Sequence, residues 1–327
     1  MEQVEERYIS LLTDFGFKRI FGSAPNKDLL ICFLNSLFNG KQVVKDVSYL
    51  NPEHVGDVYT DRRAIFDVYC EGENGEKFIV EMQNAYQTYF KDRSLFYSTF
   101  PIREQAPKGD DWDFKLNHVY TVALLNFSMN DDAFEKEKIR HHVQLCDTAT
   151  HKVFYDKLEF IYVEIAKFDK KLDELQTLYE KWLYALKNLY KLSQRPKELC
   201  DKVFDRLFEE AEIAKFSPLE MREYEASKKA YRDIKNSVDT AKRAGIAEGM
   251  EKGMKQGMEK GMKQGMKQGM EKGMKQGMEK GMKQGMEKGL EQRSFEIARK
   301  MLAKGMDAAS VMEITGLSAE QMQQLKA

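Results

Sequence analysis

A four-residue repeat constrains the fold of this chain more than any other feature of its sequence. Units of Gly-Met-Glu-Lys and Gly-Met-Lys-Gln fill residues 249–288, and the glycine period extends from Gly245 to Gly289. Each step of four residues displaces a glycine by ~40° around an α-helix, and each glycine costs a helix ~1 kcal/mol relative to alanine. The repeat therefore indicates either disorder or helices that pack closely at their small residues, with methionine filling the gaps. We expect a flexible or partner-dependent helical stalk that, with the tail after it, forms a homo-oligomer.

Composition places the rest of the chain among globular proteins. The 327 residues are 42% apolar and 11% aromatic, which is enough for a sizeable core. The longest apolar run, 119–127, is too short for a membrane span, and the acidic N-terminus lacks the pattern of a secretion signal. The four cysteines stand far apart, which argues against a zinc site or a disulfide framework. We therefore expect a cytoplasmic protein without a membrane partner.

The net charge of −1 combines a basic repeat with an acidic remainder. Ten lysines and five glutamates give the repeat a charge of +5, which leaves about −6 for the rest of the chain. A globally basic surface for nucleic acid is thus excluded, and any DNA contact requires a local patch.

The apolar patterning divides the chain into four regions and predicts the α/β fold class. We expect a globular core over 1–168, a helical extension over 169–243, the repeat stalk over 244–292 and a small helical module over 293–327. Strand-like runs rich in Val, Ile, Tyr and Phe alternate in the core with segments of helical spacing. This order is typical of a mixed sheet flanked by helices.

The individual elements of the core follow from the same patterns. Helices are predicted over 11–21, 29–38 and 88–103, and helical patterning continues over 170–243 with breaks near Pro196 and Pro218. The turn Glu73-Asn74-Gly75 joins two of the strands into a hairpin. Strands are predicted over five segments: 43–50, 63–70, 77–83, 118–127 and 160–165.

The hairpin carries the side chains best suited to chemistry. Glu81 and Gln83 are two residues apart on one strand and so face the same side of the sheet, which Asp67 on the partner strand shares if the register allows. Hard oxygen ligands without a nearby cysteine favour Mg²⁺ or Mn²⁺ over zinc, and such a carboxylate pair suits metal-assisted phosphodiester hydrolysis. The alternative is that both carboxylates lie on a solvated sheet face and pair with a nearby base: Arg62, Arg63 or Lys77.

Four stretches of the sequence resemble, in order, landmarks of a known family. They are TDFGFKRIFG at 13–22, LLICFLNSLF at 29–38, the Asp67, turn, Glu81-x-Gln83 pattern, and KDRSLFYSTF at 91–100. Together they resemble the PD-(D/E)XK nuclease superfamily, in the variant whose lysine is glutamine, and within it the Rpn family of recombination-promoting nucleases. Members of that family are often labelled PD-(D/E)XK family transposases. The resemblance implies a restriction-endonuclease-like core and a Mg²⁺- or Mn²⁺-dependent DNA endonuclease linked to recombination or mobile elements.

The resemblance also assigns catalytic and metal-binding roles to individual residues. Asp67 and Glu81 would be the metal ligands, and Gln83 takes the place of the superfamily's catalytic lysine. Asp14 matches an acidic residue that approaches the metal in some relatives, although a helix N-cap is the plainer role for Thr13 or Asp14.

Three further residues belong to the DNA side of the implied site. Lys18 and Arg93 would contact phosphate, or would form ordinary surface ion pairs, and Tyr97 would contact DNA or simply pack in the core. Because the amide of Gln83 cannot carry a positive charge, charge stabilisation must come from the metal, Lys18 or Arg93, and slow or conditional cleavage follows. The alternative is a catalytically weak or inactive protein that keeps the fold for DNA binding or self-assembly.

Two other features of the sequence carry weaker predictions. We expect the charged segment around His141-His142 to lie at the surface, since neighbouring residues of a strand face opposite ways and cannot share one ion. The tail has two short helices, and Ser318 with Gln321 forms a capping box at the start of the second. A small packing or dimer module is favoured over a DNA-binding helix-turn-helix, because the candidate recognition helix is short and carries one cation before Ala327.

Overall fold

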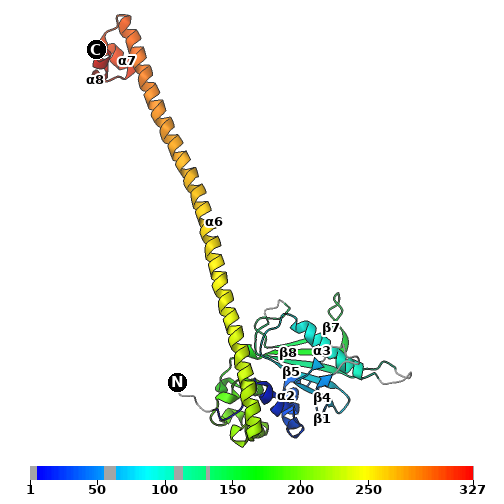
Figure 1. Ribbon diagram of the computed structural model, residues 1–327. Coiled ribbons are helices and arrows are strands. Elements are labelled where there is room, and N and C mark those ends of the chain that lie inside the picture. Colours follow the sequence, from blue (N-terminus) through cyan, green and yellow to red (C-terminus); the bar gives the residue numbers. More distant parts are fainter. Residues whose placement is uncertain (1–5, 55–63, 107–112, 130–132, 327) are drawn as a thin grey trace. The chain divides into compact units, whose positions relative to one another are not determined.

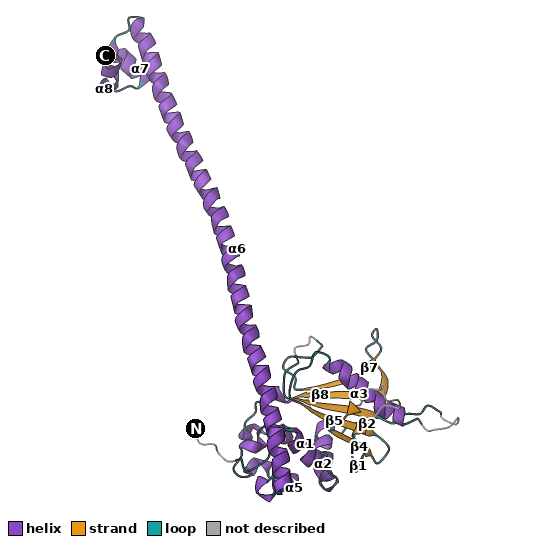
Figure 2. Cartoon of the chain, in the orientation of Figure 1, coloured by secondary structure: helices purple, strands orange, loops and turns teal. Residues whose placement is uncertain are grey.

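The chain forms two compact units, Met1–Lys242 and Arg243–Ala327. The computed structural model describes residues 6–54, 64–106, 113–129 and 133–326 (Figures 1 and 2). Among these residues, no helix combines the length and the apolar character that crossing a membrane requires. The four region boundaries expected from the sequence stay a prediction.

A mixed sheet of six strands forms the centre of the first unit. Its order is β1-β4-β5-β6-β8-β7, in which β5, β6 and β8 run parallel and the other neighbours run antiparallel. The β4–β5 pair is the predicted hairpin. The strands are β1 (Val47–Tyr49), β4 (Val68–Gly72), β5 (Lys77–Gln83), β6 (Val119–Leu125), β7 (Arg140–Cys146) and β8 (Val153–Glu164), and a separate two-stranded sheet pairs β2 (Glu53–His54) with β3 (Ala64–Ile65).

Helices cover both faces of the six-stranded sheet, which confirms the predicted α/β class. One face packs on α1 (Asp14–Phe21), α2 (Lys27–Phe38), α4 (Leu178–Asn188) and α5 (Lys202–Glu210), whose apolar side chains form one core with alternate residues of the strands. The other face packs on α3 (Phe90–Glu104), which lies across the strands in Figure 1. Alternation along β5 therefore points Phe78 and Val80 to the first core and Ile79 to the second side.

The start of α1 is fixed by a cap and by a close backbone approach. The Gly16 N–H donates to Thr13 Oγ1 at 3.1 Å, so Thr13 is the N-cap and Asp14 is not. A Cβ at Gly16 would lie 2.1 Å from the carbonyl oxygen of Ser10, and only glycine fits there. This arrangement holds α1, and with it Lys18, against the sheet.

The strands differ from the prediction at three places. The segment expected as one strand over 63–70 breaks where the Phe66 N–H donates to the Pro52 carbonyl oxygen at 3.0 Å, and Asp67 lies at the bend before β4. The edge strand β7 was not predicted, because most of its side chains are exposed or half-exposed and show no apolar alternation. Its partner β8 also begins earlier than the predicted 160–165.

The helical extension ends in one very long helix, α6 (Pro218–Ala303), that runs through the whole repeat. It begins at the predicted break, where Ser217 and Glu220 hydrogen-bond each other's main-chain N–H groups. A Cβ added at any glycine of the repeat would have no other group of the described chain within 4 Å, and the repeat methionines are 65–75% exposed. The structure thus has the helical form of the stalk and not the disordered one, while its dependence on a partner stays a prediction.

The second unit ends in two short helices, α7 (Ala308–Thr315) and α8 (Ala319–Lys326). They pack on the last turns of α6 through a small core of four buried residues: Ala298, Val311, Leu317 and Met322. The predicted capping box is confirmed, since Ser318 N–H donates to Gln321 Oε1 at 2.9 Å and Gln321 N–H donates to Ser318 Oγ at 3.2 Å.

Candidate active site

The bend before β4 brings the two predicted metal ligands together. The Asp67 N–H donates to Glu81 Oε1 at 3.3 Å, and Asp67 Oδ2 accepts a hydrogen bond from the Met82 N–H at 2.8 Å. Each carboxyl therefore binds the main chain of the other's segment. The β4–β5 register pairs Val68 with Val80 and so puts Asp67 beside Glu81 at the start of β4, on the same face of the sheet.

Both carboxyls are shielded from water, which is unusual for acidic groups. Glu81 is 6% exposed, and the Asp67 side chain is 20% exposed. Burial, with the Asp67 charge adding to it, raises the pKa of Glu81 to about 8, and burial also raises the pKa of Asp67. Two buried carboxylates this close cannot both ionise comfortably without a cation between them.

Helix α1 supplies a cation to this pair. Lys18 Nζ lies 2.8 Å from Asp14 Oδ1 and 3.9 Å from Asp67 Oδ1, so its ammonium group lies between the carboxylates of Asp14 and Asp67. The Asp14 side chain is 64% exposed on the solvent side of Lys18. The structure thus places Lys18 beside the site and leaves Asp14 as its outer partner.

Gln83 links Glu81 to helix α3. Its Nε2 donates to Glu81 Oε2 at 3.1 Å, and its Oε1 accepts from the Arg93 guanidinium, which also donates to Gln87 Oε1 at 2.6 Å. Arg93 in turn lies 5.7 Å over the ring of Tyr97. A positive charge therefore lies one amide away from Glu81, at the position where the superfamily's lysine is missing.

Tyr97 completes the wall of the site. Its ring meets Phe66 edge-on at 5.2 Å between centroids, and burial together with the nearby Glu81 carboxylate raises the pKa of its hydroxyl. All seven residues predicted from the sequence thus lie around one hydrogen-bonded network, with Asp14 at its outer end.

Two family models match the chain. Residues 11–241 match the PD-(D/E)XK nuclease family transposase, and residues 291–327 match the Rpn/YhgA-like nuclease family, C-terminal HTH domain. The first match covers more than half of the 327 residues. The chain belongs to the PD-(D/E)XK nuclease family transposases. This confirms the family resemblance, and no curated protein and no solved structure matches the chain.

The second match bears on the tail of this family member. The sequence favoured a small packing or dimer module there, and the helix-turn-helix was its second choice. The matched domain is the helix-turn-helix. The sequence interpretation gave too much weight to the single cation in the last helix, because the number of charges alone does not decide whether two helices form such a domain.

The donor set fits the kind of metal that the family implies. Among the described residues, no three His, Cys, Asp or Glu side chains gather closely enough to hold an ion, so Asp67 and Glu81 are a pair and not part of a larger cage. Mg²⁺ commonly takes one or two protein carboxylates and completes its shell with water and substrate phosphate. A buried carboxylate pair with raised pKa values is suited to that role, whereas a zinc site would need more protein ligands.

The histidine pair behaves differently from the prediction. His141 is buried, and its Nε2 lies 2.8 Å from Glu164 Oε1, so the expected surface position is wrong for this residue. Glu164 also accepts from Lys167 Nζ at 2.7 Å and from the Met129 N–H at 2.7 Å. Because β7 was not predicted, burial of one of its histidines could not be predicted either.

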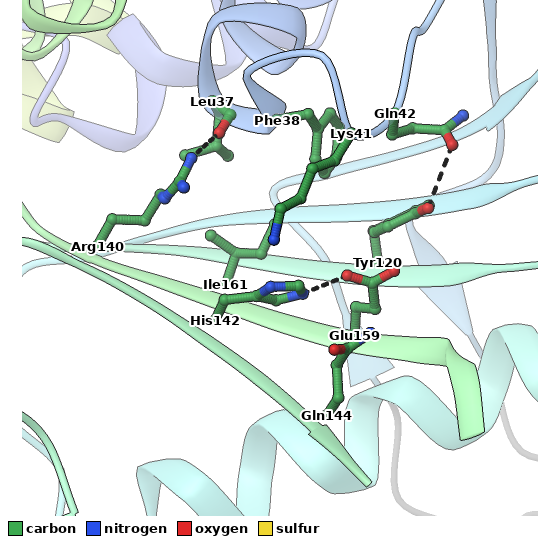
Figure 3. A pocket seen from close by; sticks show the side chains of 10 residues that line it. All are labelled: Leu37, Phe38, Lys41, Gln42, Tyr120, Arg140, His142, Gln144, Glu159 and Ile161. Carbon is green, nitrogen blue, oxygen red and sulfur yellow. Dashed lines mark hydrogen bonds and ion pairs between the residues drawn. The ribbon is translucent and has the colours of Figure 1, made fainter. Parts of the chain in front are cut away.

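His142 lies on the opposite sheet face from Glu81, beside a small pocket of about 160 Å³ (Figure 3). It hydrogen-bonds Glu159 there, and Arg140 donates to the carbonyl oxygen of Leu37 at the end of α2. As predicted, the two adjacent histidines face opposite ways. This pocket is separated by the sheet from the carboxylate pair and belongs to a different region of this nuclease-family fold.

Proposed function

We propose that this protein is a metal-dependent DNA endonuclease of the cytoplasm that hydrolyses phosphodiester bonds in recombination or mobile-element activity. The observation that carries the proposal is the interlocked, buried pair of Asp67 and Glu81, with Gln83 and Arg93 directly behind it. Membership of the PD-(D/E)XK nuclease family transposases supports the same reaction class.

Each residue has a defined task in this proposal. Asp67 and Glu81 would hold Mg²⁺ or Mn²⁺, which when bound neutralises phosphate charge and activates water. Gln83 holds the Glu81 carboxyl in one orientation, and Arg93 and Lys18 direct positive charge at the site. Arg93 supplies through its guanidinium the charge that the amide of Gln83 lacks, since a preorganised donor of this kind stabilises developing charge in a transition state.

A plasmid-nicking assay with a panel of divalent metals tests the proposal. The wild-type chain should nick with Mg²⁺ or Mn²⁺, and Asp67→Asn or Glu81→Gln should lower the rate by about 10²-fold or more. Glu159→Gln is the matched control, because it removes a largely buried carboxylate on the other sheet face. Nicking that survives both site variants would remove these residues from the mechanism.

The hydrogen bonds of Gln83 are also consistent with a second function. Its amide binds both Glu81 and Arg93, and a side chain engaged in this way also suits a weak or inactive nuclease fold that serves DNA binding or self-assembly. Calorimetric titration with Mg²⁺ separates the two functions. The endonuclease binds the ion and loses it on Glu81→Gln, whereas a pure binding module shows no heat in either chain.

The second unit supports the DNA partner of this proposal. Residues 291–327 match a C-terminal HTH domain, and the helix-turn-helix is a known class of DNA-binding fold, which supports a DNA partner. We propose that this domain brings the protein to DNA and that the repeat and tail join copies of the chain into a homo-oligomer.

A further inference from the structure

A large groove lies beside the first turns of α6, within the first unit. Its volume is about 920 Å³, and it is bounded on one side by the N-terminal segment around Arg7 and Ser10 and on another by Tyr190. The α6 wall runs from Met221 to Lys235, which is about 21 Å of helix. This is the length of about six nucleotides at a rise of ~3.4 Å per residue of a DNA strand, and it exceeds what a small metabolite needs.

The walls of the groove are held in place by buried hydrogen bonds. The hydroxyl of Tyr224, a fully buried residue, accepts from the Ser10 N–H at 3.0 Å and donates to Glu6 at 3.0 Å. The N-terminal segment and α6 are thus joined below the groove. A shape fixed in this way exists before any ligand arrives.

The charge of the groove is positive once its internal ion pairs are counted. Lys228 pairs with Glu6 at 3.2 Å and with Glu225 at 2.8 Å, so these three groups largely satisfy each other. Arg232 and Lys235 lie one and two turns further along the same wall, and in the described part of the chain neither has an acidic partner within 4.0 Å. Residues 226–242 carry five cations and two acids, so the excess continues along the helix.

A hydrogen-bonded path connects this groove to the candidate active site. The hydroxyl of Tyr231 in the groove wall accepts from Asn126 Nδ2 at 3.2 Å, and the same amide donates to Asn84 Oδ1 at 3.3 Å. The Asn126 N–H donates to the Gln83 carbonyl oxygen at 2.8 Å. Tyr231 in the groove wall therefore lies two hydrogen bonds from the main chain at Gln83, the residue whose side chain binds Glu81.

We propose that this groove binds the sugar–phosphate backbone of the DNA strand that leads to the candidate active site. Arg232 and Lys235 contact phosphates, and Tyr190 and Tyr231 offer rings against which a sugar or base can pack. The identity of the ligand as DNA rests on the proposed function, whereas the position of the groove and its charge do not.

Photo-crosslinking of the full chain tests the proposal. An oligonucleotide carrying iododeoxyuridine is irradiated with the protein in EDTA, so that no cleavage takes place, and the crosslinked peptides are identified by mass spectrometry. We expect crosslinks on the peptides that contain Tyr190 or Tyr231. The double variant Arg232→Glu with Lys235→Glu should lower that yield by about tenfold and reduce the salt dependence of binding by about 0.7 per cation removed.

The double variant Arg222→Glu with Lys229→Glu is the matched control. It makes the same change of charge on the same stretch of α6, at two exposed residues that line neither this groove nor a second pocket, which Asp14 and Lys18 of α1 line. The proposal holds if the control keeps the crosslinks that the groove variant loses. Equal loss in both variants, or crosslinks confined to residues 291–327, overturns it.

The crosslinking and nicking experiments distinguish failure of the groove proposal from failure of the proposed endonuclease function. Crosslinks in the groove together with no metal-dependent nicking would leave a DNA-binding surface on an inactive fold. Nicking abolished by Glu81→Gln but unaffected by the groove variant, with no crosslinks at Tyr190 or Tyr231, would leave the endonuclease and remove the groove.

Discussion

Asp67 and Glu81 each serve the main chain as well as the candidate site. Asp67 Oδ2 binds the Met82 N–H of β5, and Glu81 Oε1 binds the Asp67 N–H at the bend. The two acids therefore contribute to the same geometry that would present them to a cation. Because both carboxyls are buried, the stability of the metal-free protein should depend on pH.

The metal-free protein should become less stable as the pH rises toward 8. Burial raises the pKa of Glu81 from 4.5 to about 8, and that of Asp67 moves in the same direction. Between those two pH values the folded state holds a proton that the unfolded chain has released, so the free energy of unfolding falls with rising pH. Urea denaturation in EDTA across this window should show the slope in the wild type and a flatter one in Glu81→Gln.

Mg²⁺ should reverse this dependence, because the ion binds the ionised carboxylates and must displace the proton. Its affinity should rise with pH over the same window. Parallel stability curves for the wild type and Glu81→Gln would contradict the buried, proton-binding state of this carboxyl.

Arg93 should matter for turnover more than for metal binding. Its guanidinium holds Gln83 Oε1 and lies behind the carboxylates, so Arg93→Gln should lower the nicking rate by about 10²-fold while leaving the calorimetric affinity for Mg²⁺ within about twofold. Arg93→Lys keeps the positive charge but cannot make both guanidinium hydrogen bonds, to Gln83 and Gln87, so we expect partial activity from it. Equal loss of metal affinity would instead show that Arg93 mainly supports the fold of the site.

At the scale of elements, the strands and helices nearest the chemistry were the most predictable. The hairpin of β4 and β5 followed from its turn residues, and α1, α2 and α3 followed from apolar spacing. The bend at Asp67 was not predictable, because it depends on a hydrogen bond to Pro52 from outside the local sequence. The contact between Gln83 and Arg93 likewise depends on where α3 lies against the sheet.

Helix propensity did not predict the continuous helix α6. Summed glycine costs argued against an isolated helix, yet the helix is continuous through the repeat. The edge strand β7 was missed for the opposite reason, since an exposed strand shows no apolar alternation for a pattern to detect.

Gly16→Ala should destabilise the fold and displace α1. The new Cβ would lie 2.1 Å from the Ser10 carbonyl oxygen and 2.9 Å from Thr13 Oγ1, and a clash with backbone costs about 1–3 kcal/mol. Because Lys18 is on the same helix, the variant should also weaken metal-dependent nicking. Gly253→Ala is the control, since its Cβ meets nothing within 4 Å, and a thermal melt should show no loss for it.

At the scale of the whole molecule, the repeat sets the geometry of any self-association. A contact row that advances ~40° every four residues returns to its starting face after about 36 residues, or ~54 Å of helix. A period longer than 3.6 residues winds to the right, which is also the hand of close helix pairs with glycine every fourth residue. Two copies joined along this row would wrap far more tightly than an ordinary coiled coil, whose pitch is ~150 Å.

Replacing Gly257, Gly261, Gly265 and Gly269 by alanine should separate the copies of the full chain. The added methyl groups keep the helices apart, while each substitution favours the helix itself by ~1 kcal/mol. Light scattering should report a mass that falls toward the monomer, and circular dichroism a helical signal that does not decrease. A wild-type chain that is already monomeric contradicts self-association through the repeat.

The repeat has one further consequence, which lies in inheritance. Its units are nearly identical in sequence, and a Cβ added at any of its glycines would meet no other group of the described residues within 4 Å. Copying errors at such a tract add or delete whole units while the reading frame is kept. Because no packed contact depends on any single unit, such a change leaves both folded ends intact. We expect natural variants of this gene to differ in length by multiples of four residues.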